Sequence, residues 1–174
     1  MKWHISPLDD SFQKDAFDCG KPQLNEYLKQ IAGQDARRGY SKTFVATTGS
    51  ESKEVVGYYC TSASTIEFEN IPKHEDIPKR LPKYPAPAML IGRLAVDKRM
   101  QGEGLGAILL MHALSMAVRV SSEIAIFAVR VDALDEEAKR FYLHYGFAPL
   151  QDKELSLLLP MATILKSRRE HQGS

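Results

Sequence analysis

The residues best suited to chemistry lie in one stretch, RLAVDKRMQGEGLGAILL at 93–110, where an apolar strand leads through a glycine-rich turn into an apolar-faced helix. The first N–H groups of a helix have no partner within the helix and carry the positive end of its dipole, so they attract an anion. Gly102, Gly104 and Gly106 allow a ligand to approach these N–H groups closely and permit positive φ angles. The pattern therefore predicts a phosphate site, and a pyrophosphate group is the natural ligand.

The order of the glycines separates this turn from the familiar nucleotide-binding loops. It lacks the G-x-G-x-x-G order of dinucleotide-binding folds, and no Gly-Lys-Ser or Gly-Lys-Thr follows, as a P-loop requires. Three glycines alone also fit a tight turn without a ligand. However, Gln101, Gly104 and Gly106 form the pattern Q-x-x-G-x-G, which resembles the acetyl-CoA loop of the GNAT N-acetyltransferase superfamily.

This resemblance implies a fold and a cosubstrate. A GNAT protein has an α/β (α+β) fold in which a mixed central sheet is splayed between two parallel strands and flanked by helices, and here 94–96 and 124–131 would form that pair. Unpaired N–H groups in the opening, at Val96 and its neighbours, would bind the pantetheine amides of acetyl-CoA and polarise the thioester oxygen. The residues implied to bind acetyl-CoA are Leu94, Ala95, Val96, Gln101, Gly102, Gly104, Leu105, Gly106, Ala107 and Phe141.

Acetyl transfer from a thioester to an amine also needs an acid that protonates the departing thiolate. Tyr142 is the candidate, because EEAKRFYLHYGF resembles the GNAT helix whose tyrosine faces the cofactor sulfur. A phenol with a pKa of about 10 stays protonated at neutral pH and can donate. The alternative is that Tyr142 only packs in the core, since Ala138, Phe141 and Tyr145 share its helix face. Periodicity alone favours packing, whereas the resemblance favours the acid role.

A general base is harder to identify. The histidines are scattered without a carboxylate at motif spacing, at His4, His74, His112, His144 and His171. An α-amino group, with a pKa of about 8, is substantially neutral at physiological pH, whereas a lysine with a pKa of about 10.4 is not. The missing base therefore favours an α-amine acceptor. No cluster of His, Cys or Asp has the spacing of metal ligands, so we expect no metal.

Composition sets the broad class. At 174 residues, with 44% hydrophobic and 26% charged side chains, the chain fits one domain with a substantial core. A net charge of +1 neither supports nor excludes a nucleic-acid partner, which would need a local basic patch. Cys19 and Cys60 are too few for a disulfide framework and are expected to be reduced. Neither a signal peptide nor an apolar run of about 18 residues is present, so we expect a cytoplasmic protein.

Periodicity and turn residues predict a single domain at 1–165, followed by a polar tail at 166–174 that is expected to be disordered. Asp132 is expected to cap the helix that ends at Gly146. The other predicted elements are a helix at 22–33 with an apolar face of Leu24, Tyr27, Leu28 and Ile31, strands at 43–48 and 55–64, a proline-rich connection at 65–88, a strand at 89–97, a helix at 105–120, and strands at 122–132, 147–150 and 157–165.

Over residues 5–165 the chain is similar to a narrower group, the acetyltransferase toxins of bacterial type II toxin–antitoxin modules. The Cys19-Gly20 turn and the Gly92-Arg93 pair are the distinctive part of this likeness. The resemblance implies acetylation of the α-amino group of aminoacyl-tRNA, which stops translation because an amide nitrogen cannot attack the next peptidyl ester. It also implies a ribbon-helix-helix antitoxin as partner and a possible homodimer. The segments that carry it are FDCGKPQLNEYLK, TFVA, GYYCTSAS, LIGRLAVDKRMQGEGLG and FYLHYGF.

A tRNA acceptor end would need cations near the site to bind its phosphates. The candidates are Arg93, Arg37, Arg38 and Lys42, with a second basic group at Lys73, Lys79, Arg80 and Lys83; for each, a solvated surface charge is the alternative. Two other functions stay open at this point. One is a GNAT enzyme that acts on a small amine or a protein N-terminus, and the other is a non-catalytic acyl-CoA-binding module that would not need Tyr142.

Overall fold

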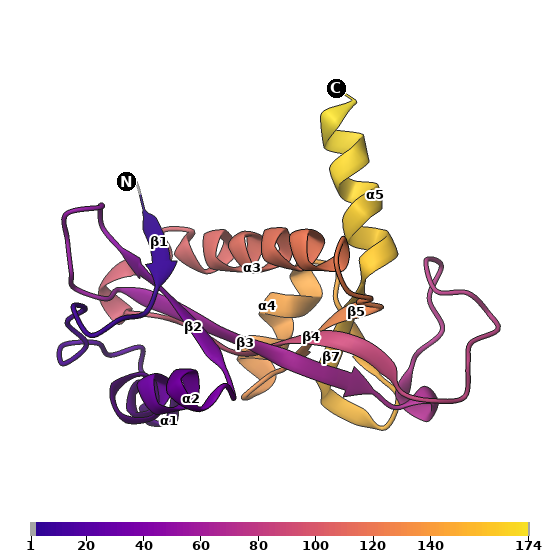
Figure 1. The fold of residues 1–174 in the computed structure, drawn as a ribbon, viewed down its shortest axis with the longest axis horizontal. Coiled ribbons are helices and arrows are strands. Elements are labelled where there is room, and N and C mark those ends of the chain that lie inside the picture. The colour runs from indigo at the N-terminus through magenta and orange to yellow at the C-terminus, as the bar shows by residue number, and fades with distance from the viewer. Residues whose placement is uncertain (1–2, 174) are drawn as a thin grey trace. The chain divides into compact units, whose positions relative to one another are not determined.

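The fold is a mixed α/β arrangement, seen in a computed structural model that describes residues 3–173 (Figure 1). Across these residues the strands follow the order β1-β2-β3-β4-β5-β7-β6 in one sheet. The elements are β1 (His4–Pro7), α1 (Pro22–Glu26), the π-helical turn η1 (Tyr27–Ile31), α2 (Ala32–Arg38), β2 (Lys42–Thr47), β3 (Gly57–Ile66), the short 3₁₀ turn η2 (Phe68–Asn70), β4 (Ala86–Val96), the 3₁₀ turn η3 (Lys98–Met100), α3 (Leu105–Ser121), β5 (Ala128–Asp132), α4 (Glu136–His144), β6 (Ala148–Leu150), β7 (Lys153–Pro160) and α5 (Met161–Gln172).

The sheet combines antiparallel and parallel pairing. β1 pairs with β2, β2 with β3, β5 with β7, and β6 with β7, all antiparallel. β4 and β5 run parallel, from the pair Ala88 and Ala128 to the pair Ile91 and Val131. The predicted mixed sheet with a parallel pair is confirmed. No helix within residues 3–173 is long and apolar enough to cross a membrane.

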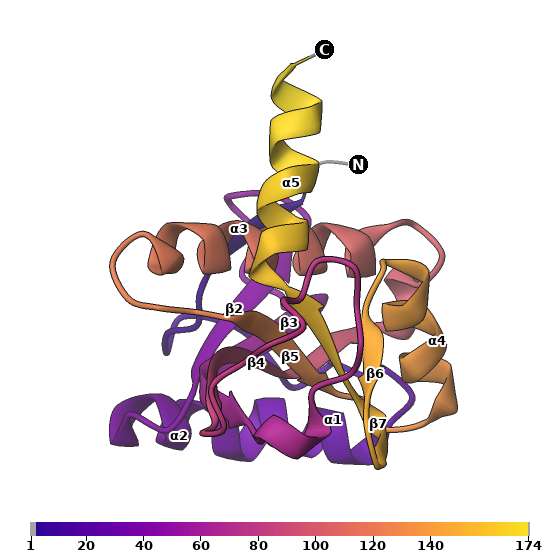
Figure 2. The same cartoon turned by 90° about the vertical axis from the view of Figure 1, so that its right-hand side faces the viewer.

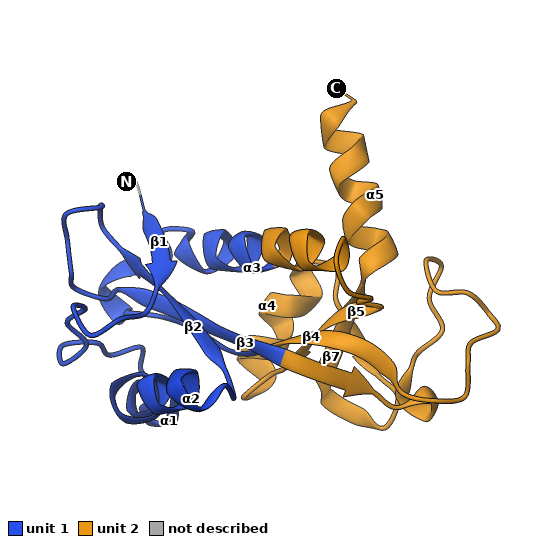
Figure 3. Cartoon of the chain, in the orientation of Figure 1, with its two compact units in different colours: residues 1–62, 92–113 blue, residues 63–91, 114–174 orange. Residues whose placement is uncertain are grey.

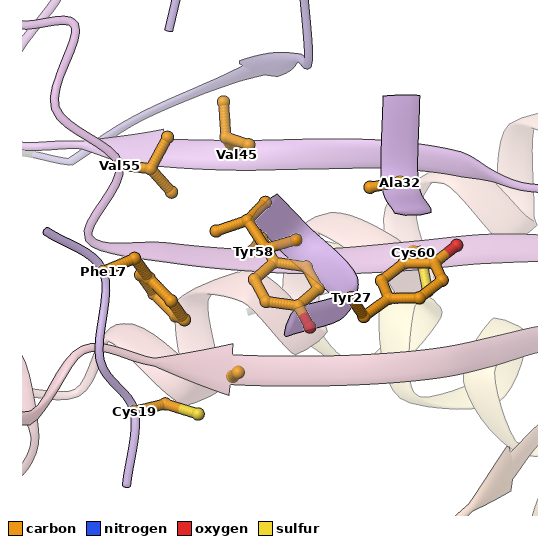
Figure 4. Close-up of a cluster of buried hydrophobic side chains, with 10 residues drawn as sticks. Phe17, Cys19, Tyr27, Ala32, Val45, Val55, Tyr58 and Cys60 are labelled. Atoms are coloured by element: carbon orange, nitrogen blue, oxygen red, sulfur yellow. The ribbon is translucent and has the colours of Figure 1, made fainter. Parts of the chain in front are cut away.

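The chain forms two compact units, 1–62 with 92–113 and 63–91 with 114–174, which Figure 3 shows in blue and orange. In the first unit, side chains of β3 pack against helices on both faces of the sheet, because successive residues of a strand point to opposite sides. Tyr58 packs against Phe17 and Tyr27, at ring distances of 5.6 and 6.5 Å (Figure 4). On the other face, Tyr59 contacts His112 of α3 through its hydroxyl, 2.8 Å from the imidazole Nδ1. The prediction of one domain at 1–165 stays a prediction.

The π-helical turn η1 changes which residues of the first helix are buried. A π turn holds one more residue than an α turn, so it rotates the following residues around the helix axis. Ala32 is fully buried in consequence, whereas Ile31, which was predicted to share the apolar face of Tyr27, is 40% exposed. The helix also continues through Gly33 as α2 and ends only at Gly39, which takes a left-handed φ of 75°.

The second unit is centred on β5 and β7. Its core includes Ile77 from the proline-rich connection, which packs with Ile66, Ala128 and Leu158. The connection is therefore anchored although it forms no long helix. The predicted strand at 122–132 was too long, since β5 begins only at Ala128.

The predicted cap of α4 was wrong. Asp135 lies at the N-cap, and its Oδ1 accepts a hydrogen bond from the Ala138 N–H at 2.9 Å. Asp132 instead accepts from the Ser156 hydroxyl at 2.7 Å, because it belongs to β5 and faces its neighbour in β7. At the other end, Gly146 follows the helix with a φ of 90°, as the predicted C-terminal glycine requires.

The C-terminal segment is helical, where the sequence predicted a strand to 165 and a disordered tail. β7 ends at Pro160, which has no N–H to continue the ladder, and α5 follows at once (Figure 2). Met161 and Ile164, three residues apart, are both buried. Arg168 donates to the Ser115 hydroxyl and the Thr163 hydroxyl donates to Asp76, so two polar side chains attach the helix to the rest of its unit.

Replacing Gly57 with alanine should destabilise the fold. A Cβ at this position would lie 2.9 Å from Leu105 Cδ2 and 3.2 Å from Leu109 Cδ1, in a packed interface with α3. Overpacking of this kind costs about 1–3 kcal/mol. Urea unfolding of Gly57→Ala measures the loss of unfolding free energy. Gly49→Ala is the control, because a Cβ there meets nothing within 4 Å; an equal effect of both substitutions would refute the packing argument.

Candidate functional site

The glycine turn before α3 has the backbone that the sequence predicted. Gly102 and Gly104 have φ values of 82° and 89°, in the left-handed region that side chains disfavour. A Cβ at either position would meet nothing within 4 Å, so the turn needs these glycines for their backbone angles rather than for internal packing. Gly106 differs, because it is already the second residue of α3. The N-terminal N–H groups of a 17-residue helix thus follow an open turn.

The turn is braced from behind. Gln101 donates its side-chain Nε2 to two carbonyl oxygens, Val96 at 2.9 Å and Cys19 at 3.1 Å. The Lys98 N–H donates to the Asp18 carbonyl at 2.8 Å. These bonds connect the end of β4 with the segment that precedes α1. Gln101, a predicted acetyl-CoA residue, therefore uses its amide N–H groups to shape the turn.

Asp97 is a residue that the sequence analysis missed. Its carboxylate is 2% exposed and accepts hydrogen bonds from the Arg99 N–H, Nε and Nη2 and from the Asp18 N–H, at 2.9 to 3.1 Å. Arg99 also pairs with Glu54 at 2.8 Å. Burial raises the pKa of Asp97, but the hydrogen bonds from Arg99 and Asp18, with the Arg99 charge, hold it below its ordinary value of 3.8. Asp97 is a buried, ionised anchor directly before the turn.

Leu94, Ala95 and Val96 form the last part of β4. The parallel register with β5 reaches Ile91 and Val131, and β5 ends one residue later at Asp132, whereas β4 continues to Val96. β4 therefore extends beyond the end of its parallel neighbour. Leu105 and Ala107, the other predicted residues of this group, lie in the first turn of α3.

Arg93 lies on β4 and stacks on a buried aromatic ring. Its guanidinium carbon lies 3.7 Å from the ring centroid of Tyr27, and Nη1 lies 4.0 Å from the Cys60 Sγ. Burial raises the pKa of Tyr27 to about 12, so its hydroxyl stays protonated and donates to Asp35 at 2.9 Å. Arg93 itself is exposed. The ring fixes the orientation of the cation without neutralising its charge.

The other predicted RNA-binding cations belong to the same unit as Arg93. Arg37 and Arg38 are exposed in the last turn of α2, and Lys42 is exposed at the first position of β2. None of the three takes part in an ion pair recorded for residues 3–173. The second basic group, at 73–83, lies in the connection of the other unit.

Tyr142 lies on α4 in the second unit. It is 5% exposed and contacts Phe141 and Phe147 edge-to-face, at ring distances of 5.2 and 5.4 Å. Phe141 also contacts Tyr145 at 5.1 Å, so the predicted aromatic face of this helix is present. These ring contacts hold the Tyr142 side chain in a fixed environment, and its role as an acid stays a prediction.

His112, one of the scattered histidines, packs against the stacked rings of Phe44 and Tyr59. Glu103 is exposed on the glycine turn. Cys19 and Cys60 are buried, free thiols, in the predicted turn and strand. Among the described residues no three His, Cys, Asp or Glu side chains gather as a metal ion would require.

Comparison with known proteins gives a family and close relatives. Residues 39–149 match the family described as acetyltransferase (GNAT) domain. The tRNA-acetylating toxin of Mycobacterium tuberculosis is 33% identical over 163 residues, which cover 91% of this chain and 93% of that protein.

Solved structures agree with this. AtaT complexed with acetyl-methionyl-tRNAfMet is 28% identical with a TM-score of 0.86, over 99% of this chain and 100% of that one. A tyrosine-to-phenylalanine mutant of the AtaT toxin, bound to the C-terminus of the antitoxin AtaR and to acetyl-CoA, is 27% identical with a TM-score of 0.81, over 95% and 98%.

Replacing Asp97 with asparagine should destabilise the fold in a pH-dependent way. The folded pKa lies below the unfolded value, so the carboxylate contributes stability above about pH 4 and loses it as the pH falls through the folded pKa. At pH 7 we expect Asp97→Asn to cost about 2–4 kcal/mol, and the difference from wild type should shrink below about pH 4. Urea unfolding at pH 7, 5 and 3.5 measures this. The exposed Asp10→Asn is the control, and a pH-independent difference for Asp97→Asn would contradict the prediction.

Proposed function

Because this chain belongs to the GNAT acetyltransferase family, we propose that it transfers the acetyl group of acetyl-CoA to the α-amino group of aminoacyl-tRNA and so acts as a toxin that blocks translation. The observation that carries this proposal is the similarity to a tRNA-acetylating toxin over 91% of the chain, well beyond the GNAT match at 39–149. The acceptor-specific part of a GNAT enzyme lies outside its cofactor loop, so similarity over the front end bears on the substrate.

Acetyl-CoA would bind at the glycine turn and the end of β4. The pyrophosphate would accept hydrogen bonds from N–H groups at the turn, where Gly102 and Gly104 leave the backbone open. The pantetheine amides and the thioester oxygen would bind the N–H groups of Leu94 to Val96, in the part of β4 that extends beyond β5. Binding of acetyl-CoA by the AtaT mutant, a protein with a similar fold, supports acetyl-CoA as the cosubstrate.

Tyr142 would be the general acid. The neutral amine attacks the thioester carbonyl, and a backbone N–H at Val96 stabilises the oxygen as it becomes negative. The carbon–sulfur bond then breaks, the thiolate takes the Tyr142 phenolic proton, and the amine loses its extra proton to solvent. A phenol has an ordinary pKa of about 10, so it carries this proton at neutral pH. Phe141 would pack beside the cofactor.

The acceptor would be positioned by cations of the first unit. Arg93, oriented by the Tyr27 ring, is best placed to hold a phosphate, and Arg37, Arg38 and Lys42 would bind others. A small ribbon-helix-helix antitoxin would restrain the toxin, as the AtaT complex with the C-terminus of AtaR suggests by analogy. We also propose that the protein forms a homodimer and acts in the cytoplasm, where charged tRNA is used.

The proposal predicts transfer of labelled acetyl from acetyl-CoA to charged tRNA but not to uncharged tRNA. Tyr142→Phe should lower kcat about a hundredfold or more, since it removes the acid but keeps the ring. Thermal unfolding of the variant should match wild type. Label on polyamines or peptides and not on charged tRNA would move the function to another amine. Undiminished transfer by Tyr142→Phe would remove the acid role.

Arg93→Ala should raise the KM for charged tRNA with little change in the KM for acetyl-CoA. Loss of one phosphate contact should also make the negative slope of log binding constant against log salt concentration shallower by about one unit. Arg93→Lys keeps the charge but loses the planar stack on Tyr27, so we expect an intermediate KM. The exposed Arg119→Ala is the control, and equal effects of the two alanine variants would show that Arg93 acts only through net charge.

A further inference from the structure

Tyr40 has the most exposed large apolar side chain among the described residues, with 74% of its surface open to solvent. It lies in the turn between α2 and β2 and has no role in the site described so far. A single exposed ring is common on protein surfaces, so the case for a role rests on the residues around it.

The backbone holds Tyr40 in place. Gly39 ends α2 in a left-handed conformation, and the N–H groups of Tyr40 and Ser41 both donate to the Asp35 carbonyl, at 2.9 and 3.4 Å. The turn is therefore a hydrogen-bonded helix end rather than a free loop. The backbone at Tyr40 is therefore ordered before a partner binds, and binding has only the side-chain rotation left to restrict.

Asp35 connects this turn to Arg93. Its backbone carbonyl anchors Tyr40, while its carboxylate accepts the hydrogen bond from the Tyr27 hydroxyl. The Tyr27 ring in turn carries the Arg93 guanidinium at 3.7 Å. The exposed ring and the stacked cation thus depend on one residue, and both belong to the first unit.

Cations dominate the charge around Tyr40. The segment at 36–42, ARRGYSK, contains Arg37, Arg38 and Lys42, and the carboxylate of the preceding Asp35 accepts a hydrogen bond from the Tyr27 hydroxyl. All three cations are exposed, and none is in an ion pair recorded within residues 3–173. An exposed aromatic ring between free cations matches single-stranded nucleic acid, in which phosphates bind the cations and an unpaired base stacks on the ring.

We propose that Tyr40 is a stacking platform for an unpaired base at the 3′ acceptor end of tRNA, flanked by Arg37, Arg38 and Lys42 on the phosphates. The proposal rests on the function proposed above and names a residue that positions its substrate. A base-paired stem would present only phosphates and grooves to this surface, so the ring distinguishes the unpaired end from the stem.

Tyr40→Ala should raise the KM for charged tRNA about tenfold or more, with kcat and the KM for acetyl-CoA near wild type. Tyr40→Phe keeps the ring and should behave as wild type. Ile124→Ala, at a position 62% exposed, is the control for loss of an exposed apolar side chain. A KM unchanged in Tyr40→Ala, or raised equally in Tyr40→Phe, would overturn the proposal.

Salt dependence separates stacking from charge. Arg37→Ala and Arg38→Ala should each make the negative slope of log binding constant against log salt concentration shallower by about one unit. Tyr40→Ala should weaken binding at every salt concentration and leave the slope unchanged. A changed slope in Tyr40→Ala would mean that the ring only orients the neighbouring cations.

Binding of uncharged tRNA tests the contact without catalysis. Wild type and Tyr40→Ala are each titrated with intact tRNA and with tRNA trimmed of its unpaired 3′ end. If Tyr40 stacks on that end, the variant binds intact tRNA more weakly, and the two proteins bind trimmed tRNA equally. A persisting difference on trimmed tRNA would refute the assigned base. This binding experiment needs no acetyl transfer, so it gives a result even if the labelling experiment fails.

A different result would assign the ring to a protein partner instead. In that case both proteins would bind intact tRNA equally, and the variant would bind the antitoxin more weakly.

Discussion

The buried carboxylate of Asp97 is the constraint on which the first unit depends. It lies where β4 ends and must be ionised to accept four hydrogen bonds, three from Arg99 and one from the Asp18 N–H. An ionised group at 2% exposure is tolerable only with this many donors. The network therefore fixes two segments at once, the start of the glycine turn and the chain that leads into α1.

The same network extends to the start of α1. Asp18 also accepts from the Gly20 N–H and from Asn25 of α1, and Asn25 accepts from the Cys19 N–H, so the start of α1 is fixed relative to η3. One turn later α1 becomes the π-helical turn that carries Tyr27. The glycine turn and the ring under Arg93 are thus connected through one set of hydrogen bonds and the helix that begins at Pro22.

The sequence predicted what depends on local backbone requirements. Gly102, Gly104 and Gly146 have the positive φ values that glycine favours, and the parallel pair follows from a strand, a helix and a strand in succession. It failed where distant partners decide. Ala32 is buried instead of Ile31 because of a π turn that hydrophobic periodicity does not predict. Asp97 accepts one of its hydrogen bonds from Asp18, 79 residues away in the sequence. The helical tail was missed because its polar residues find partners, such as Ser115, only in the folded unit. Of the candidate site, the sequence identified the turn and the stacked arginine's position, but not the contacts that hold either.

Arg93 and Arg99, six positions apart, show how the partner of an arginine decides its use. Arg99 is paired with two carboxylates, Asp97 and Glu54, so an anionic ligand would have to displace them, and its role is to hold the fold. Arg93 lies on the face of a neutral ring whose raised pKa, about 12, keeps it from becoming an anion. An aromatic ring orients the guanidinium but leaves its N–H groups able to bind a phosphate, whereas a carboxylate partner would occupy those N–H groups. An enzyme that must bind and release a polyanion is served by cations held in this way, and Tyr27 provides that support from a helix that the Asp97 network has already fixed.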